Sequence, residues 1–204
     1  MDNKFEKLFA EYPFTLTDEM VKEAAQDILA KHFDENNNVE VWKQCLHSID
    51  LTTLNGEDTT EKVETMAQRV NEFETHFPDI PNVAAMCVYP SLVQTAADTL
   101  TEPIGIAAVA AGFPASQTFV EIKVAESAMA VAAGATEIDI VISIGKFLEG
   151  NYQEVYDEIS EIKAAIKDAI VFFTVIDVLP RYLLIRPAVN SRGSADLSVS
   201  RKKS

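Results

Sequence analysis

The alternation of short apolar runs with amphipathic stretches is the feature that most constrains how this chain can fold. Five short, mainly apolar runs predict buried strands at 49–54, 83–89, 104–111, 134–142 and 170–176. Between them, apolar side chains recur at three- and four-residue spacing, as on one face of a helix. Asp58 with Glu61 predicts a capping box for the first of these helices, and Ser116 predicts the N-cap of the third. Strands that alternate with helices every ~25–35 residues favour a parallel β/α architecture.

Two architectures fit this alternation, a doubly wound open sheet and a (β/α)8 barrel. No Gly-x-Gly-x-x-Gly motif follows a predicted strand and the sequence has no P-loop, so the sequence disfavours nucleotide-binding folds. Polar residues stand at or near the ends of four predicted strands, namely Thr52, Cys87, Asp139 and Thr174. Because β/α barrels place their chemistry at the carboxyl ends of the strands, this pattern favours the barrel.

The sequence also predicts a division into three parts. Residues 1–47 predict a helical extension, a lid or outer layer, in which Thr17 caps one helix and a second short helix passes through Val41 and Trp42. Residues 48–176 form the β/α domain. Residues 177–204 show neither helical nor alternating periodicity, are low in apolar residues towards their end, and are expected to be disordered.

Charge separates the last part from the rest of the chain. The net charge is −15, which argues against nucleic acid as a partner. Residues 1–176 carry 11 basic and 30 acidic side chains, whereas residues 177–204 carry 6 basic and 2 acidic ones. The sequence has no apolar run of membrane-spanning length and no signal-peptide pattern. Cys45 and Cys87 form neither a disulfide framework nor a zinc spacing, and a reducing, cytoplasmic setting is expected.

Asp139 is the strongest candidate for a chemical role, because a carboxylate in an apolar strand needs a partner. Its run, GATEIDIVI at 134–142, is otherwise rich in β-branched residues. Asp139 could be a structural residue that accepts hydrogen bonds from backbone N–H groups. It could equally be a general acid or base at a strand end.

Four motifs in order extend this interpretation: DLTTLN at 50–55, AAMCVYP at 84–90, AGFPASQT at 111–118 and GATEIDIVI at 134–142. With them the chain resembles the deoxyribose-phosphate aldolases, class I Schiff-base aldolases with a TIM-barrel fold, over roughly residues 48–176. The resemblance implies reversible cleavage of 2-deoxy-D-ribose 5-phosphate to D-glyceraldehyde 3-phosphate and acetaldehyde. It implies no metal or organic cofactor, because a lysine iminium is the electrophile.

The resemblance also implies roles for individual residues. Asp139 matches the family's proton-relay carboxylate, Asp50 and Thr52 match positions that line the pocket mouth, and Cys87 matches a cysteine close to the substrate. Thr174 occupies the place of the Schiff-base lysine, and its hydroxyl cannot form an iminium. Among the other lysines, Lys146 alone follows a predicted strand and is the candidate substitute. Four lysines are expected to be solvated charges on helix faces, namely Lys62, Lys123, Lys163 and Lys167.

The expected glycine-rich phosphate loops and a second active-site lysine do not occur after residue 176. We therefore interpret the chain as an incomplete barrel of about five β/α units, truncated after the fifth strand, with residues 177–204 from a shifted reading frame or a spliced-in end. A natural short paralogue with a basic tail is the alternative. The two open sheet edges predict aggregation or pairing with a second copy. Besides the aldolase, a catalytically inactive β/α fragment or interaction protein remains open, as does a different phosphate-binding barrel enzyme.

Overall fold

The computed structural model describes residues 4–13 and 15–173 of the chain. Its centre is a five-stranded, fully parallel sheet whose spatial order is the order of the sequence, β1-β2-β3-β4-β5. The strands are β1 (Asp50–Thr52), β2 (Ala85–Val88), β3 (Gly105–Val109), β4 (Glu137–Ile140) and β5 (Ile170–Phe173). The connecting helices are α4 (Thr60–His76), the 3-10 turn η1 (Pro90–Leu92) with α5 (Val93–Thr99), α6 (Val120–Ala132), and α7 (Ile144–Leu148) with α8 (Tyr152–Ile166).

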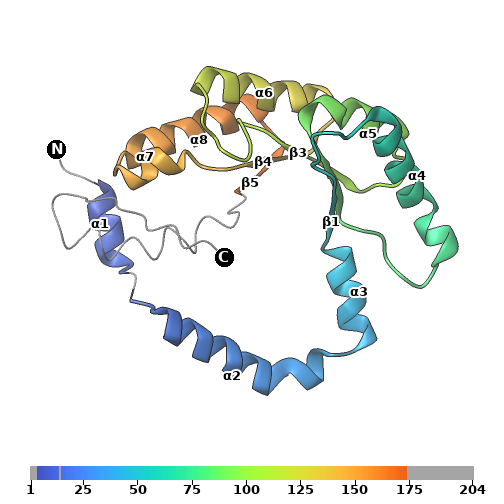
Figure 1. Cartoon of the computed structure of the whole chain (residues 1–204), viewed down its shortest axis with the longest axis horizontal. Helices are drawn as coiled ribbons and strands as arrows, with labels where there is room; N and C mark the ends of the chain where they lie inside the picture. The colour runs from blue at the N-terminus through green and yellow to red at the C-terminus, as the bar shows by residue number, and fades with distance from the viewer. Residues whose placement is uncertain (1–3, 14, 174–204) are drawn as a thin grey trace, which may run out of the picture.

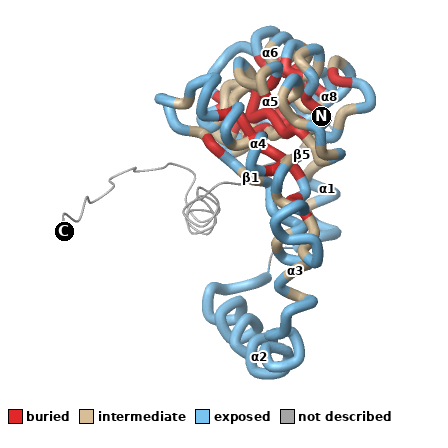
Figure 2. Tube along the Cα trace, turned by 90° about the vertical axis from the view of Figure 1, so that its right-hand side faces the viewer, coloured by how far each residue is buried: buried red, intermediate tan, exposed pale blue. Residues whose placement is uncertain are grey.

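The apolar core lies between one face of the sheet and these helices. Buried side chains of the strands, including Met86, Ile106 and Ile138, pack there against Val63 of α4 and Ile162 of α8. Full burial of a side chain of this size contributes roughly 1.5–3 kcal/mol each. Figure 1 shows α4, α5, α6 and α8 along this one side of the sheet, and Figure 2 shows that the buried residues concentrate there.

Sequential strand order with the strand-connecting helices on one side is the arrangement of a β/α barrel segment. A doubly wound sheet would reverse its strand order and cover both faces with helices. The barrel prediction is therefore confirmed, as an arc of five strands. The opposite face, which we call the inner face, carries a smaller buried cluster of Cys87, Ala107 and Val109.

The N-terminal part is helical, with α1 (Lys4–Glu11), α2 (Asp18–Asn36) and α3 (Val39–His47). The predicted cap is confirmed, since the Thr17 side chain accepts a hydrogen bond from the Met20 N–H at 3.2 Å. Figure 1 shows these helices on the side of the sheet away from α4, α5 and α6. α1 is held by aromatic contacts, with the ring of Phe9 4.9 Å from that of Tyr152 in α8. α2 buries none of its residues.

Two predicted caps are wrong, and both errors concern loops that follow strands. α4 is capped by Thr59, whose side chain accepts from the Lys62 N–H at 3.2 Å, because Asp58 is bound within the preceding loop. α6 begins at Val120 after Phe119, and Ser116 instead lies in the β3–α6 loop with a positive φ of 55°. The end of the fifth predicted strand, 174–176, and the segment 177–204 lie outside the described residues.

Candidate active site

The inner face brings together the four predicted site residues that the structure describes. In the strand register, Thr52 pairs with Cys87, Cys87 with Ala107, and Ala107 with Glu137. Because side chains alternate along a strand, Asp50 shares the face of Thr52, and Asp139 shares the face of Glu137. Three strands therefore contribute Asp50, Thr52, Cys87 and Asp139 to one surface.

These side chains differ in their access to water. Asp50 and Thr52 lie on the edge strand and are exposed, whereas Cys87 is 2% exposed and Asp139 is half-buried. The Thr52 hydroxyl donates to the Asp50 carbonyl at 2.8 Å, which fixes its position at the edge of the site. The site is thus open at β1, most enclosed at Cys87 on β2, and intermediate at Asp139 on β4.

Glu137 is a member of the inner face that the sequence analysis did not select. A Cβ added to Gly105 would lie 2.6 Å from Glu137 Oε1, so the missing side chain of Gly105 makes room for this carboxylate. Burial, and then the charges of Asp50 and Asp139, raise the pKa of Glu137. Strand alternation could have found it, because Glu137 precedes Asp139 by two residues.

The carboxylates of the inner face also affect the pKa of the Cys87 thiol. Burial, and then the charge of Asp139, raise the pKa of Cys87 to about 12, with smaller contributions from Asp50 and Glu137. A hydrogen bond with Thr52 opposes this shift. At neutral pH Cys87 is therefore a protonated thiol, suited to packing against a ligand rather than to nucleophilic attack.

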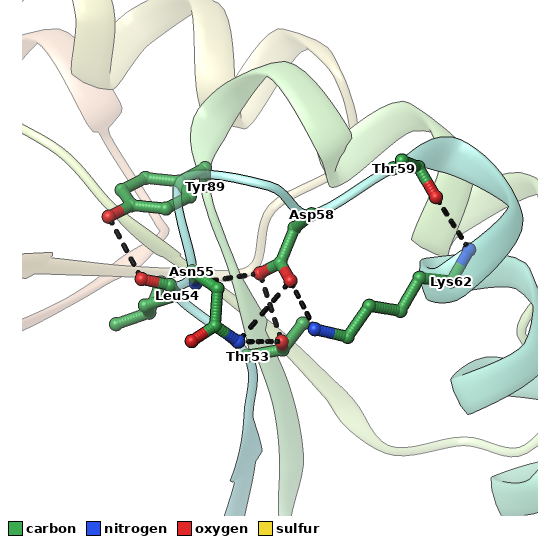
Figure 3. A network of polar contacts seen from close by, with 7 residues as sticks. All are labelled: Thr53, Leu54, Asn55, Asp58, Thr59, Lys62 and Tyr89. Atoms are coloured by element: carbon green, nitrogen blue, oxygen red, sulfur yellow. Dashed lines mark hydrogen bonds and ion pairs between the residues drawn. The ribbon is translucent and has the colours of Figure 1, made fainter.

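A separate polar network shapes the rim of the site after β1 (Figure 3). The Asp58 carboxylate accepts hydrogen bonds from the Thr53 hydroxyl and the Asn55 backbone N–H, each at 2.9 Å, and forms an ion pair with Lys62. Directly after β2, the Tyr89 hydroxyl donates to the Leu54 carbonyl at 3.1 Å. The Lys62 interaction, the largest influence, lowers the pKa of Asp58 to about 2. The loop is thereby held over the carboxyl end of β1.

The lysines do not all behave as the sequence analysis expected. The prediction that Lys123 is solvated is wrong, since it is 0% exposed and forms a 2.8 Å ion pair with Glu158 of α8. Lys146 lies in α7, is partly exposed, and forms a 3.0 Å ion pair with Glu154. Its hydrogen bond with Glu154 raises the pKa of Lys146. A raised pKa keeps the amine protonated, the opposite of what Schiff-base formation requires.

Three further points concern Thr174, metal-binding clusters and membrane-spanning helices. Thr174, the predicted counterpart of the lysine, lies outside the described residues. Within residues 4–13 and 15–173, no cluster of three or more His, Cys, Asp or Glu side chains is arranged to hold a metal ion. None of the helices in those ranges is long and apolar enough to cross a bilayer.

The fold and the inner face define a class of protein, a β/α-barrel chain with carboxylates on the inner face of its sheet. Residues 45–186 match the model of the DeoC/LacD family of aldolases, and the chain belongs to this family. Human deoxyribose-phosphate aldolase is 38% identical over 133 residues, which cover 59% of this chain and 42% of the human protein. The mouse deoxyribose-phosphate aldolase is 34% identical over 157 residues, 71% of this chain and 49% of the mouse protein. The chain thus spans about half the length of the curated relatives it matches.

Solved structures agree with this assignment. An aldolase called QR15 matches with a TM-score of 0.55 and 25% identity, over 62% of this chain and 52% of its own. The deoxyribose phosphate aldolase from Aeropyrum pernix matches with a TM-score of 0.54 over 72% of this chain and 57% of its own. At 23% identity, the second likeness supports the fold alone.

Proposed function

We propose that the chain carries the acid–base half of a deoxyribose-phosphate aldolase site. The reaction is the reversible cleavage of 2-deoxy-D-ribose 5-phosphate to D-glyceraldehyde 3-phosphate and acetaldehyde. The observation that carries the proposal is the convergence of Asp50, Thr52, Cys87 and Asp139 on one face of the sheet. The family membership and the names of the relatives support the choice of substrate.

The chemistry needs a nucleophile and a proton relay. A neutral lysine amine attacks the carbonyl carbon, water leaves, and the iminium draws electrons from the carbon–carbon bond. One group takes the proton of the substrate hydroxyl, and a proton returns to the enamine carbon. We assign this proton transfer to Asp139, with Asp50 and Thr52 at the rim and Cys87 against the substrate. No metal or organic cofactor is needed in this scheme.

The chain has no lysine nucleophile at the position that matches the family's lysine. By the resemblance, residue 174 is the position of the family's lysine, and it is a threonine here. The alternative, Lys146, is paired with Glu154. We therefore propose that this polypeptide, as it stands, does not form the covalent intermediate. A catalytically inactive β/α chain that acts by binding is the second candidate, and Thr174 is the observation that favours it. The expected setting is the cytoplasm, where the free thiols of Cys45 and Cys87 persist.

Trapping with acetaldehyde and borohydride tests both halves of the proposal. An imine on a lysine is reduced to a stable N-ethyl adduct, which peptide mass spectrometry locates. We expect the native chain to show no adduct above that of the denatured chain, and Thr174→Lys to gain one at position 174. An adduct on Lys146 in the native chain would show that a substitute nucleophile exists. If position 174 stayed unmodified in Thr174→Lys, this result would contradict the assignment of position 174 as the Schiff-base position.

A further inference from the structure

A buried polar cluster lies outside the inner face, between the helices behind β4. The Lys123 ammonium of α6 donates to Ser116 Oγ at 2.8 Å and to Ser143 Oγ at 2.7 Å, and contacts Glu158 Oε1 at 2.8 Å. The Ser143 hydroxyl in turn donates to the Glu158 carboxylate, 2.9 Å from Oε2. Each of the four residues is at most 7% exposed.

Packing alone does not explain why this cluster consists of charged and hydroxyl side chains. An ammonium has three N–H donors, and here each has its own acceptor. Replacing a buried ion pair by apolar side chains of similar volume is often neutral or stabilising. Aliphatic side chains would therefore fill the space between α6 and α8 at least as favourably.

The cluster connects two chain segments that follow neighbouring strands, and this connection indicates its role. Ser116 belongs to the loop after β3, and Ser143 to the segment after β4, four residues beyond Asp139. These two connections leave the carboxyl ends of adjacent strands, on either side of the Val109–Asp139 pair. α6 holds the first loop at a second point, where the Gly112 N–H donates to Glu126 Oε2 at 2.9 Å.

We propose that Lys123 is a positioning residue that fixes the two rim loops after β3 and β4, and through them the surroundings of Asp139. It does so from the helical layer and without touching the inner face. The role rests on the proposed function of Asp139, but the anchoring of the loops does not. A third rim loop, after β1, is held independently by Asp58 and Lys62 and supplies an internal comparison.

Amide hydrogen exchange of the full chain, read by mass spectrometry, tests the anchoring. Ser116→Ala should speed exchange about tenfold in residues 111–118, and Ser143→Ala should do so in 141–149, each leaving residues 53–58 unchanged. Lys123→Met with Glu158→Met removes both ties without leaving an unpaired charge, and should loosen both loops. Lys62→Met is the matched control, because it should loosen only residues 53–58.

Two further readouts separate positioning from general stability. The melting temperatures of the two serine variants should stay close to that of the native chain. In a Thr174→Lys background, Ser143→Ala should slow solvent exchange of the acetaldehyde methyl protons by about tenfold with adduct formation retained. Unchanged exchange of the rim loops in the serine variants would overturn the inference. Absence of any methyl exchange in Thr174→Lys would instead count against the proposed function and leave the loop result standing.

Discussion

Asp58 shows how a single residue couples the candidate site to pH. Its carboxylate has a folded-state pKa of about 2, lowered from 3.8. A lowered pKa means that the folded chain favours the charged form. The stabilisation is therefore complete above the unfolded pKa and is lost as the pH falls towards the folded value.

We accordingly expect native Asp58 to stabilise the chain fully above about pH 4 and progressively less down to about pH 2. Urea unfolding of the native chain and of Asp58→Asn should give stabilities that converge over this interval. Thr59→Ala is a suitable control, because it removes the α4 cap without changing charge. A difference between native and Asp58→Asn that stays constant from pH 5 to about pH 2 would contradict the assignment.

Residue-level prediction succeeded where local pattern decides and failed where distant contacts decide. Thr17 could be recognised as a helix cap because capping is local. The sequence also singles out Asp139, because its neighbours Ile138 and Ile140 are apolar, but its chemical role remains a prediction. Lys123 could not be placed, because its burial depends on Glu158 and Ser143, which come 35 and 20 residues later in the chain. Asp58 was misassigned by one position, since Thr59 offers the same kind of side-chain acceptor.

At the level of elements, the helices fall into two groups. α4, α6 and α8 each bury residues against the sheet, whereas α2 buries none, although it carries exposed apolar side chains such as Ile28, Leu29 and Phe33. Most helix stability in proteins comes from the packing of an apolar face. The 19 residues of α2 lack that contribution in the described chain.

Amide hydrogen exchange should therefore rank the helices. We expect α2 to exchange at least about a hundredfold faster than α6 and α8 in the isolated chain. Thr17→Ala, which removes the cap, should accelerate α2 further without affecting α8. Protection of α2 equal to that of α8 at low protein concentration would show that its apolar face is covered by this same chain.

At the level of the whole molecule, the strand order leaves β1 and β5 as the outer strands of the described sheet. Each of them pairs with one neighbour, so the outward N–H and C=O groups of β1 have no partner strand among residues 4–13 and 15–173. Unpaired edges favour association with another chain. A closed barrel of this family avoids the problem by pairing its first strand with its last.

Light scattering after size exclusion tests this expectation. The molar mass of the native chain should rise with concentration, and the unfolding transition should broaden or shift with it. Lys146→Ala, on the exposed surface of α7, should leave this concentration dependence unchanged. A monomer at all concentrations with one cooperative transition would contradict association through the edges.

Solvent exchange of the methyl protons of acetaldehyde tests the central claim most directly. In deuterium oxide, a lysine iminium loses a methyl proton to a base and regains a deuteron, which proton NMR follows. We predict that Thr174→Lys catalyses this exchange and that Asp139→Asn in the same background reduces it at least about a hundredfold while the borohydride-trapped adduct still forms. Equal exchange with and without Asp139 would contradict the assignment of the acid–base role to the inner face.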